Sequence, residues 1–222
     1  SFPLDSNIVW VHQEQQQGTG HAVIQAIPEI DDDDVVLIAY GDVPLVKAET
    51  LKPLCECINK HELALLTTQL EDPLGYGRIV RNSKNEILKI VEEKDASDEI
   101  RNNNEINTGI MAAKGSSLKS WLARLSNDNA QGEYYLTDCV AHAVEDGASI
   151  TSVNCSNPTE IQGVNNRHQQ AMLERAYQLG QAELLMDNGV TLADPARLDV
   201  RGTVSVGKDV FIDINAVFIV FF

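Results

Sequence analysis

VVLIAYGDVPL, residues 35–45, contains the strand around which we expect the other elements to assemble. Five consecutive apolar residues, Val35 to Ala39, follow the solvated run Asp31 to Asp34 and predict a strand buried on both faces, as in the centre of a parallel sheet. Pro44 prevents the strand from continuing. In open α/β sheets the ligand crevice lies beyond the carboxyl ends of the strands, which makes Asp42 a candidate site residue. A turn or a helix cap explains Asp42 equally well at this stage.

The composition is typical of a globular protein with one core and an appendage, or with two small domains. The chain has 222 residues, of which 43% are hydrophobic. We find no apolar run long enough to span a bilayer and no signal-peptide pattern, so we expect no membrane partner. The formal net charge of -16 disfavours a nucleic-acid partner, because phosphate backbones require clustered Lys and Arg. We interpret the cysteines as buried or neutral thiols of a reducing compartment rather than a disulfide or zinc site: Cys55, Cys57, Cys139 and Cys155.

Strand and helix patterns alternate along most of the chain. Strands are predicted at residues 8–11, 35–39, 63–68, 78–81, 87–95, 106–113 and 149–153, the fourth and fifth forming a hairpin. Apolar residues at helical spacing follow the Gly-rich turn at 18–20 and recur at 48–58, 118–125 and 136–143. The polar stretch 95–105 predicts a surface loop. The alternation favours a mainly parallel α/β sheet.

Two further patterns follow this region. Residues 165–189 predict one long helix with an apolar stripe made of Leu173, Ala176, Tyr177, Gly180 and Leu184. Beyond it, apolar residues recur every six positions in two rows: Val200, Val206, Ile212 and Phe218, and Val204, Val210, Ala216 and Phe222. A period of six is typical of a parallel β-helix, in which each repeat buries its apolar face only when neighbours stack on it.

Three short motifs allow both a ligand-binding and a structural interpretation. The GTG turn at 18–20 opens a helix, where backbone N–H groups can approach a ligand closely, although most such turns only join elements. The glycines beside Tyr76 favour a bulge over a ligand contact. The residues Glu92, Glu93 and Lys94 are interpreted as an ordinary exposed edge.

Taken together, the segments QGTGHA, YGDVPL, DPLGYGRI, EEKDA, EINTGI, NAQGEYYLTD and IQGVNNR resemble, in this order, the bacterial bifunctional N-acetylglucosamine-1-phosphate uridylyltransferase/glucosamine-1-phosphate acetyltransferases. Each motif is weak alone, but the match runs along almost the whole chain. The resemblance implies a Rossmann-like nucleotidyltransferase domain at 1–165, a linker helix at 166–189 and the first rungs of a left-handed parallel β-helix at 190–222. It also implies transfer of UMP from UTP to N-acetylglucosamine 1-phosphate with Mg²⁺, giving UDP-N-acetylglucosamine and pyrophosphate in the cytoplasm, for peptidoglycan and lipopolysaccharide synthesis.

Carried over by position, the resemblance also implies the site residues. These are Gln13, Gly18 and Thr19 for the uracil, Tyr40 and Gly41 beside the nucleotide, Gly77, Glu92 and Asn107 for the sugar, and Asp42 and Asn165 for Mg²⁺. Few protein oxygens plus substrate phosphates are the usual ligands of this cation. The histidines keep structural interpretations: His12, His21, His61, His142 and His168.

The chain departs from the family pattern at both ends. The family's LAAGxGTRM-type phosphate loop and Pro-Lys pair, whose Arg and Lys neutralise the triphosphate, do not occur in the sequence. We therefore leave the catalytic residues unassigned and expect a fragment with little or no turnover. Most of the acetyltransferase domain is also absent, and with it the acetyl-CoA and glucosamine 1-phosphate sites and the homotrimer that the family implies. The segment AVFIVFF at 216–222 leaves the family's six-residue pattern.

Two other functions stay open at the level of sequence. One is a related nucleotidyltransferase for another sugar phosphate or base, which the polar residues Gln13, Glu92 and Asn107 would distinguish, because a changed base or sugar needs changed partners. The other is a non-catalytic sugar-nucleotide-binding protein.

Overall fold

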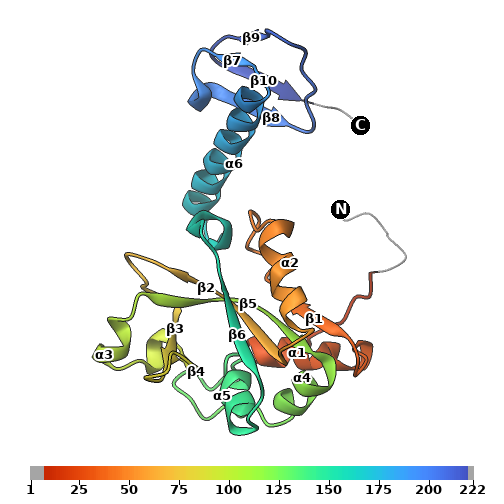
Figure 1. Cartoon of the computed structure of the whole chain (residues 1–222), viewed down its shortest axis with the longest axis vertical. Coiled ribbons are helices and arrows are strands. Elements are labelled where there is room, and N and C mark those ends of the chain that lie inside the picture. The colour runs from red at the N-terminus through yellow and green to blue at the C-terminus, as the bar shows by residue number, and fades with distance from the viewer. Residues whose placement is uncertain (1–7, 220–222) are drawn as a thin grey trace. The chain divides into compact units, whose positions relative to one another are not determined.

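The computed structural model describes residues 8–219 and divides into two compact units. Residues up to Gly41 together with Val46–Pro158 form the first unit, and Asp42–Leu45 together with the residues from Thr159 onward form the second. Figure 1 shows their elements. Within the described part of the chain, none of the helices combines the length and the apolar character needed to cross a membrane.

The first unit is built on a six-stranded mixed sheet. Its strands are β1 (Val35–Ile38), β2 (Leu63–Gln69), β3 (Gly77–Arg81), β4 (Ile87–Val91), β5 (Glu105–Lys114) and β6 (Ile150–Asn154). Their order is β4-β3-β5-β2-β6, and β1 also pairs with β5. Among the described strands of this sheet, β2 and β6 are the single parallel pair. The α/β class is confirmed, but the prediction of a mainly parallel sheet is wrong.

The strand β5 runs against the strands on both of its sides, which explains this error. One edge of β5 pairs with β2, and the other pairs with β3 at Ile106 and Asn107 and with β1 from Met111 to Lys114. The strand enters the sheet after the β3–β4 hairpin and the short helix α3 (Asp98–Arg101), without a crossover helix. Between its pairing with β3 and its pairing with β1, this edge of β5 meets none of the described strands at Gly109, so the sheet is open there.

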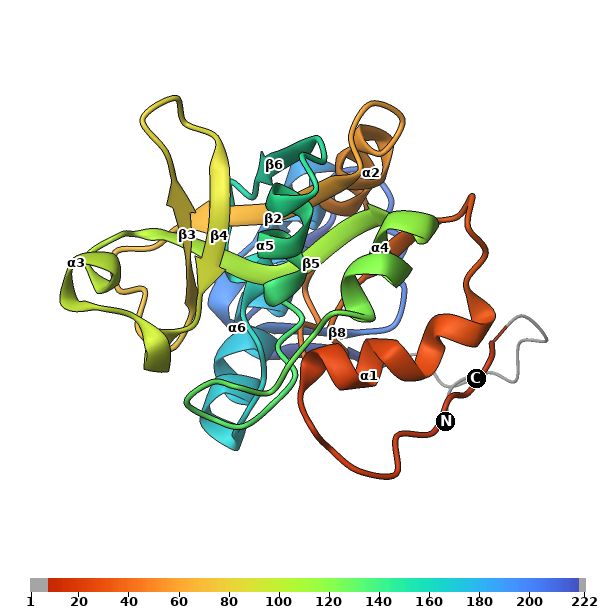
Figure 2. The same cartoon turned by 90° about the horizontal axis from the view of Figure 1, so that it is seen from below.

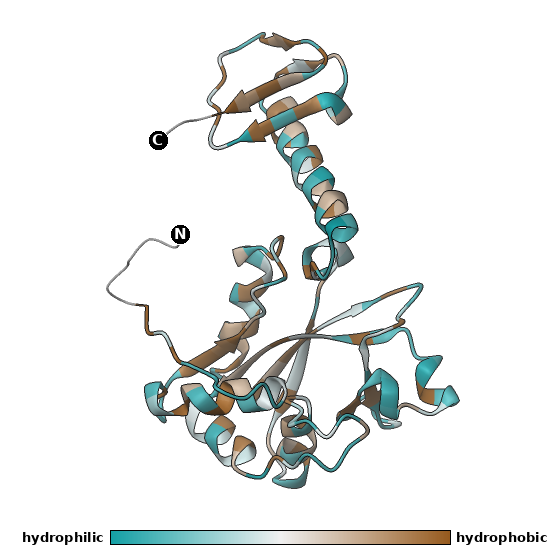
Figure 3. Ribbon diagram, turned by 180° about the vertical axis from the view of Figure 1, so that it is seen from behind, coloured by the Kyte–Doolittle hydropathy of each residue, from teal (hydrophilic) through white to brown (hydrophobic). Residues whose placement is uncertain are grey.

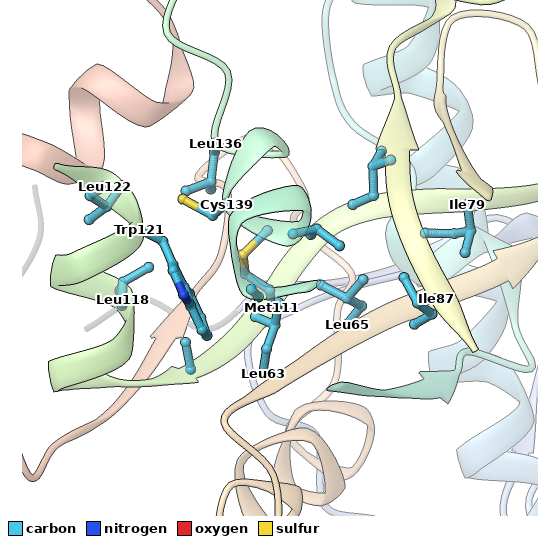
Figure 4. Close-up of a cluster of buried hydrophobic side chains, with 14 residues drawn as sticks. Leu63, Leu65, Ile79, Ile87, Met111, Leu118, Trp121, Leu122, Leu136 and Cys139 are labelled. Atoms are coloured by element: carbon cyan, nitrogen blue, oxygen red, sulfur yellow. The ribbon is translucent and has the colours of Figure 1, made fainter. Parts of the chain in front are cut away.

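Helices cover both faces of the sheet (Figures 1 and 2). The helices are α1 (Thr19–Ala26), α2 (Ala48–Cys57), α4 (Gly115–Leu122) and α5 (Asp138–Glu145), with 3₁₀ turns at Ile27–Glu29, Glu93–Asp95, Pro158–Ile161 and Pro195–Arg197. Figure 4 shows the apolar core, in which Trp121 and Leu118 of α4 meet Met111 of β5. The indole N–H of Trp121 donates to Asp146 at 3.0 Å, so its polar end is satisfied although the ring is buried.

All four cysteines are free thiols. Burial is the main cause that raises the pKa of Cys139, to about 12, and that also raises the pKa of Cys55. Both thiols are therefore neutral at pH 7, as the sequence indicated.

Three local predictions need correction. The strand β1 is confirmed, but Val35 and Leu37 are 48% and 37% exposed rather than buried. It pairs with β5 alone among the described strands, so a run of apolar residues here marks an edge and not the centre of the sheet. Residues 8–11 form no strand, and their side chains are exposed. The predicted loop at 95–105 contains α3.

The second unit contains the predicted long helix, α6 (Arg167–Asp187), but with a different buried face. Tyr177 and Leu184, assigned to the apolar stripe, are 41% and 57% exposed. The side chains that α6 buries are Leu173, Gln178, Ala182 and Leu185. Gln178 accounts for the shift, because its amide pairs with a strand backbone: the Val200 N–H donates to Oε1 at 2.7 Å, and Nε2 donates to the Val200 carbonyl at 3.2 Å. A buried polar residue interrupts the apolar pattern from which the buried face of a helix is predicted.

Short parallel strands follow α6 in this unit. They are β7 (Thr191–Leu192), β8 (Leu198–Arg201), β9 (Phe211–Ile212) and β10 (Ala216–Ile219), paired β7 with β9 and β8 with β10. Members of both predicted six-residue rows pack into one apolar cluster with α6, and β10 is apolar along its length (Figure 3). The described residues form two parallel strand pairs, which by themselves show no β-helix, so its first rungs stay a prediction. Phe222 lies outside the described residues.

Candidate functional site

The GTG turn packs against the backbone around Tyr134. Gly18 has φ 109°, and a Cβ there would lie 2.6 Å from the Tyr134 carbonyl oxygen; one at Gly20 would lie 2.9 Å from the same atom. The Gly20 N–H donates to this carbonyl at 2.8 Å, and the Leu136 N–H donates to Thr19 Oγ1 at 3.2 Å. Both glycines are therefore required by the close approach of two backbone segments, and this contact fixes the N-terminus of α1.

Gln13 lies beside this turn and faces a hollow of about 750 Å³. Its Nε2 donates to the Gly18 carbonyl at 3.4 Å and lies 2.9 Å from His21 Nδ1. Gln13, Gly18 and Thr19, which the resemblance assigns to the uracil, line the hollow together, and their part in binding stays a prediction. Most of the other wall is apolar and comes from α1 and β1: Ala22, Val23, Ala26, Val36, Leu37 and Ile38.

A second, smaller hollow of about 220 Å³ adjoins the first. Thr19, Tyr40 and Glu133 line both hollows. The ring of Tyr40 rests on Gly109, whose φ is 82° and where an added Cβ would overlap the ring. Gly109 is thus the residue of β5 that makes room for Tyr40 where the sheet opens. Gly41, in contrast, has nothing within 4 Å of an added Cβ, so the protein itself does not require a glycine there.

The three residues predicted to hold a sugar meet in the smaller hollow. Gly77 and Asn107 are opposite each other in the β3–β5 pair, and Glu92 Oε2 lies 3.4 Å from the position of a Cβ at Gly77. Asn107 is 6% exposed, and its Oδ1 is a buried acceptor without a hydrogen-bond partner in the structure. Buried acceptors are nearly always paired, so this oxygen is a candidate for a ligand contact.

Burial raises the pKa of Glu92 at this site. A 2.8 Å hydrogen bond from Thr137 Oγ1 opposes this shift, while the charges of Asp138 and Asp95 add to it. Burial also raises the pKa of Asp138. The lining therefore contains a partly desolvated carboxyl group, Glu92, which suits a ligand that offers hydroxyl and amide N–H donors.

The loop that carries Gly77 is held by a buried arginine. Arg78 is 2% exposed, donates to the Tyr76 carbonyl and pairs with Glu93 at 2.8 Å. Glu93 also accepts from the Gly75 N–H at 3.4 Å. The prediction of an ordinary exposed edge at 92–94 is therefore wrong for its two glutamates, because one lines the hollow and the other fixes the loop beside it.

Asp42 and Asn165 both belong to the second unit. The Val164 N–H donates to the Asp42 carbonyl at 2.8 Å, and a Cβ at Gly163 would lie 3.4 Å from Asp42 Oδ2. The fold thus brings Asp42 against the residues that directly precede Asn165. One carboxylate and one amide oxygen fit Mg²⁺, which usually keeps several waters and takes its other ligands from phosphates. The described residues contain no cluster of three or more His, Cys, Asp or Glu side chains suited to a metal ion.

Sequence reasoning missed several residues of the smaller hollow. The lining also includes Tyr76, Thr108, Gly109, Gln131, Tyr135 and Thr137. All of them fall within the segments DPLGYGRI, EINTGI and NAQGEYYLTD that carried the resemblance. The motifs therefore contained the signal, but no local pattern distinguished these residues from their neighbours.

Comparison with known proteins agrees with this architecture. Residues 3–106 match the family model of the MobA-like NTP transferase domain. The chain is 54% identical over 214 residues to the bifunctional protein GlmU of Marinobacter nauticus, and 56% identical over 211 residues to that of Cellvibrio japonicus. These alignments cover 96% and 95% of the chain and 47% of each relative.

A solved structure of a candidate glucose-1-phosphate thymidylyltransferase from Bacillus anthracis, in complex with sucrose, shares the fold. It has a TM-score of 0.52 and 21% identity, covering 65% of this chain and 55% of that one. The fold is the α/β nucleotidyltransferase fold with a mixed sheet, and the matched family model covers residues 3–106 of it. More narrowly, the chain is a homologue of the bifunctional protein GlmU. It spans about half the length of the curated relatives that it matches.

Proposed function

We propose that the chain forms the uridylyltransferase domain of a GlmU-type enzyme. In this function, UMP is transferred from UTP to N-acetylglucosamine 1-phosphate, and UDP-N-acetylglucosamine and pyrophosphate are formed. The identity of more than half of the aligned residues to GlmU proteins supports the class. One observation supports the assignment of the sugar substrate. Three residues from separate strands or strand ends line one polar hollow: Gly77, Glu92 and Asn107.

The chemistry of that hollow matches an N-acetylated sugar. Asn107 Oδ1 is an acceptor without a partner, and the acetamido N–H of the sugar is a donor of the kind it needs. Glu92 accepts one hydrogen bond from Thr137 and has further acceptor capacity for sugar hydroxyls. Gly77 leaves the space beside Glu92 open, because a side chain there would lie against the carboxylate.

We assign the uridine to the larger hollow and the metal to Asp42 and Asn165. Gln13 offers an amide to the base edge, with Gly18 and Thr19 beside it. When bound, Mg²⁺ supplies positive charge that screens the phosphates of the two substrates. The chain needs this help, since its own formal net charge of -16 repels anions.

The remaining parts of the proposal follow the bifunctional relatives. Acetyl transfer from acetyl-CoA to glucosamine 1-phosphate and assembly as a homotrimer are proposed for a protein of the relatives' full length. The product would serve peptidoglycan and lipopolysaccharide synthesis in the cytoplasm.

Isothermal titration of the folded chain with UDP-N-acetylglucosamine tests the proposal. We expect micromolar binding that weakens without Mg²⁺ and in Asp42→Ala. Asn107→Leu removes the amide oxygen but keeps the shape, and should weaken binding about tenfold, as expected for one buried hydrogen bond. Asn127→Leu, at an exposed loop position, is the matched control and should bind like the unsubstituted chain.

UDP-glucose provides the second arm of this experiment, because it lacks the acetamido group. The unsubstituted chain should prefer UDP-N-acetylglucosamine, and Asn107→Leu should lose that preference. A chain shown by circular dichroism to be folded, yet binding neither ligand, would contradict the proposed function. Equal binding of both ligands would contradict the assignment of Asn107.

A further inference from the structure

His21, in the first turn of α1, contacts a glutamine with each of its ring nitrogens. Its Nδ1 lies 2.9 Å from Gln13 Nε2, and its Nε2 lies 3.2 Å from Gln25 Nε2. The ring also lies near that of Tyr134, with centroids 6.1 Å apart. His21 does not itself line the larger hollow, whereas Gln13 does. Any effect of His21 on a ligand in this hollow therefore acts through Gln13.

A neutral imidazole cannot accept from both glutamines, because one ring nitrogen carries the proton and the other accepts. The contact with Gln13 is the shorter of the two. We therefore assign the acceptor role to Nδ1 and the proton of the neutral ring to Nε2. The Gln25 amino group, which also donates to the His21 carbonyl at 3.1 Å, cannot accept this proton, so the Gln25 amide must turn its oxygen toward Nε2 or move away from it.

This tautomer determines which end of the Gln13 amide is left for a ligand. The amino group has two protons, and the Gly18 carbonyl and His21 Nδ1 both accept from it. The Gly18 carbonyl only accepts, so it also opposes a reversed amide. The group of Gln13 that remains for a ligand is its carbonyl oxygen, Oε1, which is an acceptor.

We propose that His21 is a positioning residue that orients Gln13 as an acceptor and so selects uracil over cytosine. Uracil carries an N–H at ring position 3 and matches an acceptor, whereas cytosine carries a lone pair there and is repelled by it. The inference rests on the proposed function, since it concerns the nucleotide base of the same site. It changes the interpretation of His21, which the sequence indicated to be structural.

Titration calorimetry of the full chain with UDP and with CDP, in the presence of Mg²⁺, tests this proposal. His21→Phe keeps a ring beside Tyr134 but removes the acceptor, so the Gln13 amide is free to turn. We expect the preference for UDP over CDP to fall about tenfold, mainly through weaker UDP binding. Gln25→Met removes the other partner of His21 and is the matched control; it should keep the preference.

The tautomer is measured independently of any ligand by ¹⁵N NMR of the histidine rings, with the His21 signals identified by their loss in His21→Phe. We expect a protonated Nε2 and an unprotonated Nδ1 at pH 8. A proton on Nδ1, or a His21→Phe chain that keeps its full preference for UDP, would overturn the inference. Failure of the folded chain to bind either nucleotide would instead contradict the proposed function, and the inference with it.

Discussion

Substitution of Gly109 by alanine is the most direct test of how the site is built. Gly109 has φ 82°, and alanine in this left-handed region costs about 1–2 kcal/mol. The new Cβ would also overlap Cε2 of Tyr40 and lie 2.9 Å from Cζ and 3.0 Å from Cδ2, so the ring must move. Overpacking of this kind costs about 1–3 kcal/mol. We therefore expect Gly109→Ala to lower the free energy of unfolding by about 2–5 kcal/mol.

Gly147→Ala is the matched control for the backbone contribution. Gly147 follows α5 with φ 69°, and nothing lies within 4 Å of an added Cβ. It should therefore lose only the backbone part, about 1–2 kcal/mol. Urea unfolding followed by Trp fluorescence measures both variants, because Trp121 lies in the core of the same unit.

The double variant Tyr40→Ala/Gly109→Ala separates steric overlap from other effects. With the ring removed, the Cβ at position 109 meets no overlap, so the cost of the second substitution should fall to that of Gly147→Ala. If Gly109→Ala costs no more than Gly147→Ala, the ring of Tyr40 does not rest on this glycine, and our account of the smaller hollow is wrong.

Three further substitutions test other parts of the structure. Burial raises the pKa of Glu92 above its ordinary 4.5, so the stability that this group contributes is present below pH 4.5 and is lost as the pH rises through its pKa in the folded state. The stability of Glu92→Gln relative to the parent should therefore increase from pH 4 to pH 7. A difference in urea midpoints that does not change with pH would contradict this. Gln178→Leu leaves the Val200 backbone unpaired and should cost about 1–3 kcal/mol, although the new residue is more apolar, whereas the exposed Gln170→Leu should change thermal unfolding little. Gly41→Ala has open space for its Cβ and no positive φ, so it should keep or raise stability by up to about 1 kcal/mol; a marked loss in urea unfolding would refute this.

The periodicity of apolar residues was enough to locate most of the strands and helices, but not their pairing. The hairpin of β3 and β4, the strand β5 and the helix α6 all lie where local patterns predict them. The direction of β5 was missed because an apolar strand has the same pattern in either direction. Which face of α6 is buried was missed for a related reason: Gln178 is buried through its bonds to Val200, which lies on a different element.

The candidate site shows the same limit. Gly77, Glu92 and Asn107 were chosen through the resemblance, and the structure brings them into one hollow. Thr137 was not chosen, since its part in the site is a hydrogen bond to Glu92, a residue 45 positions away. Arg78 lies in the predicted strand, but its burial and its ion pair with Glu93 leave no mark in the strand pattern. Roles that depend on a partner in space leave no periodic signal in the sequence.

The glycines of the motifs show why such partners decide the interpretation. Gly18 and Gly20 look like a ligand loop, yet a side chain at Gly18 would meet the backbone of Tyr134, and one at Gly20 would meet Leu125 and the Tyr134 carbonyl oxygen. Gly109 lies in an ordinary strand pattern, yet it makes room for Tyr40. Gly41 has neither requirement and lies between Tyr40 and Asp42, so its part in holding a ligand close to the backbone stays a prediction. The glycine least constrained by the protein is therefore the one whose substitution reports most directly on the ligand.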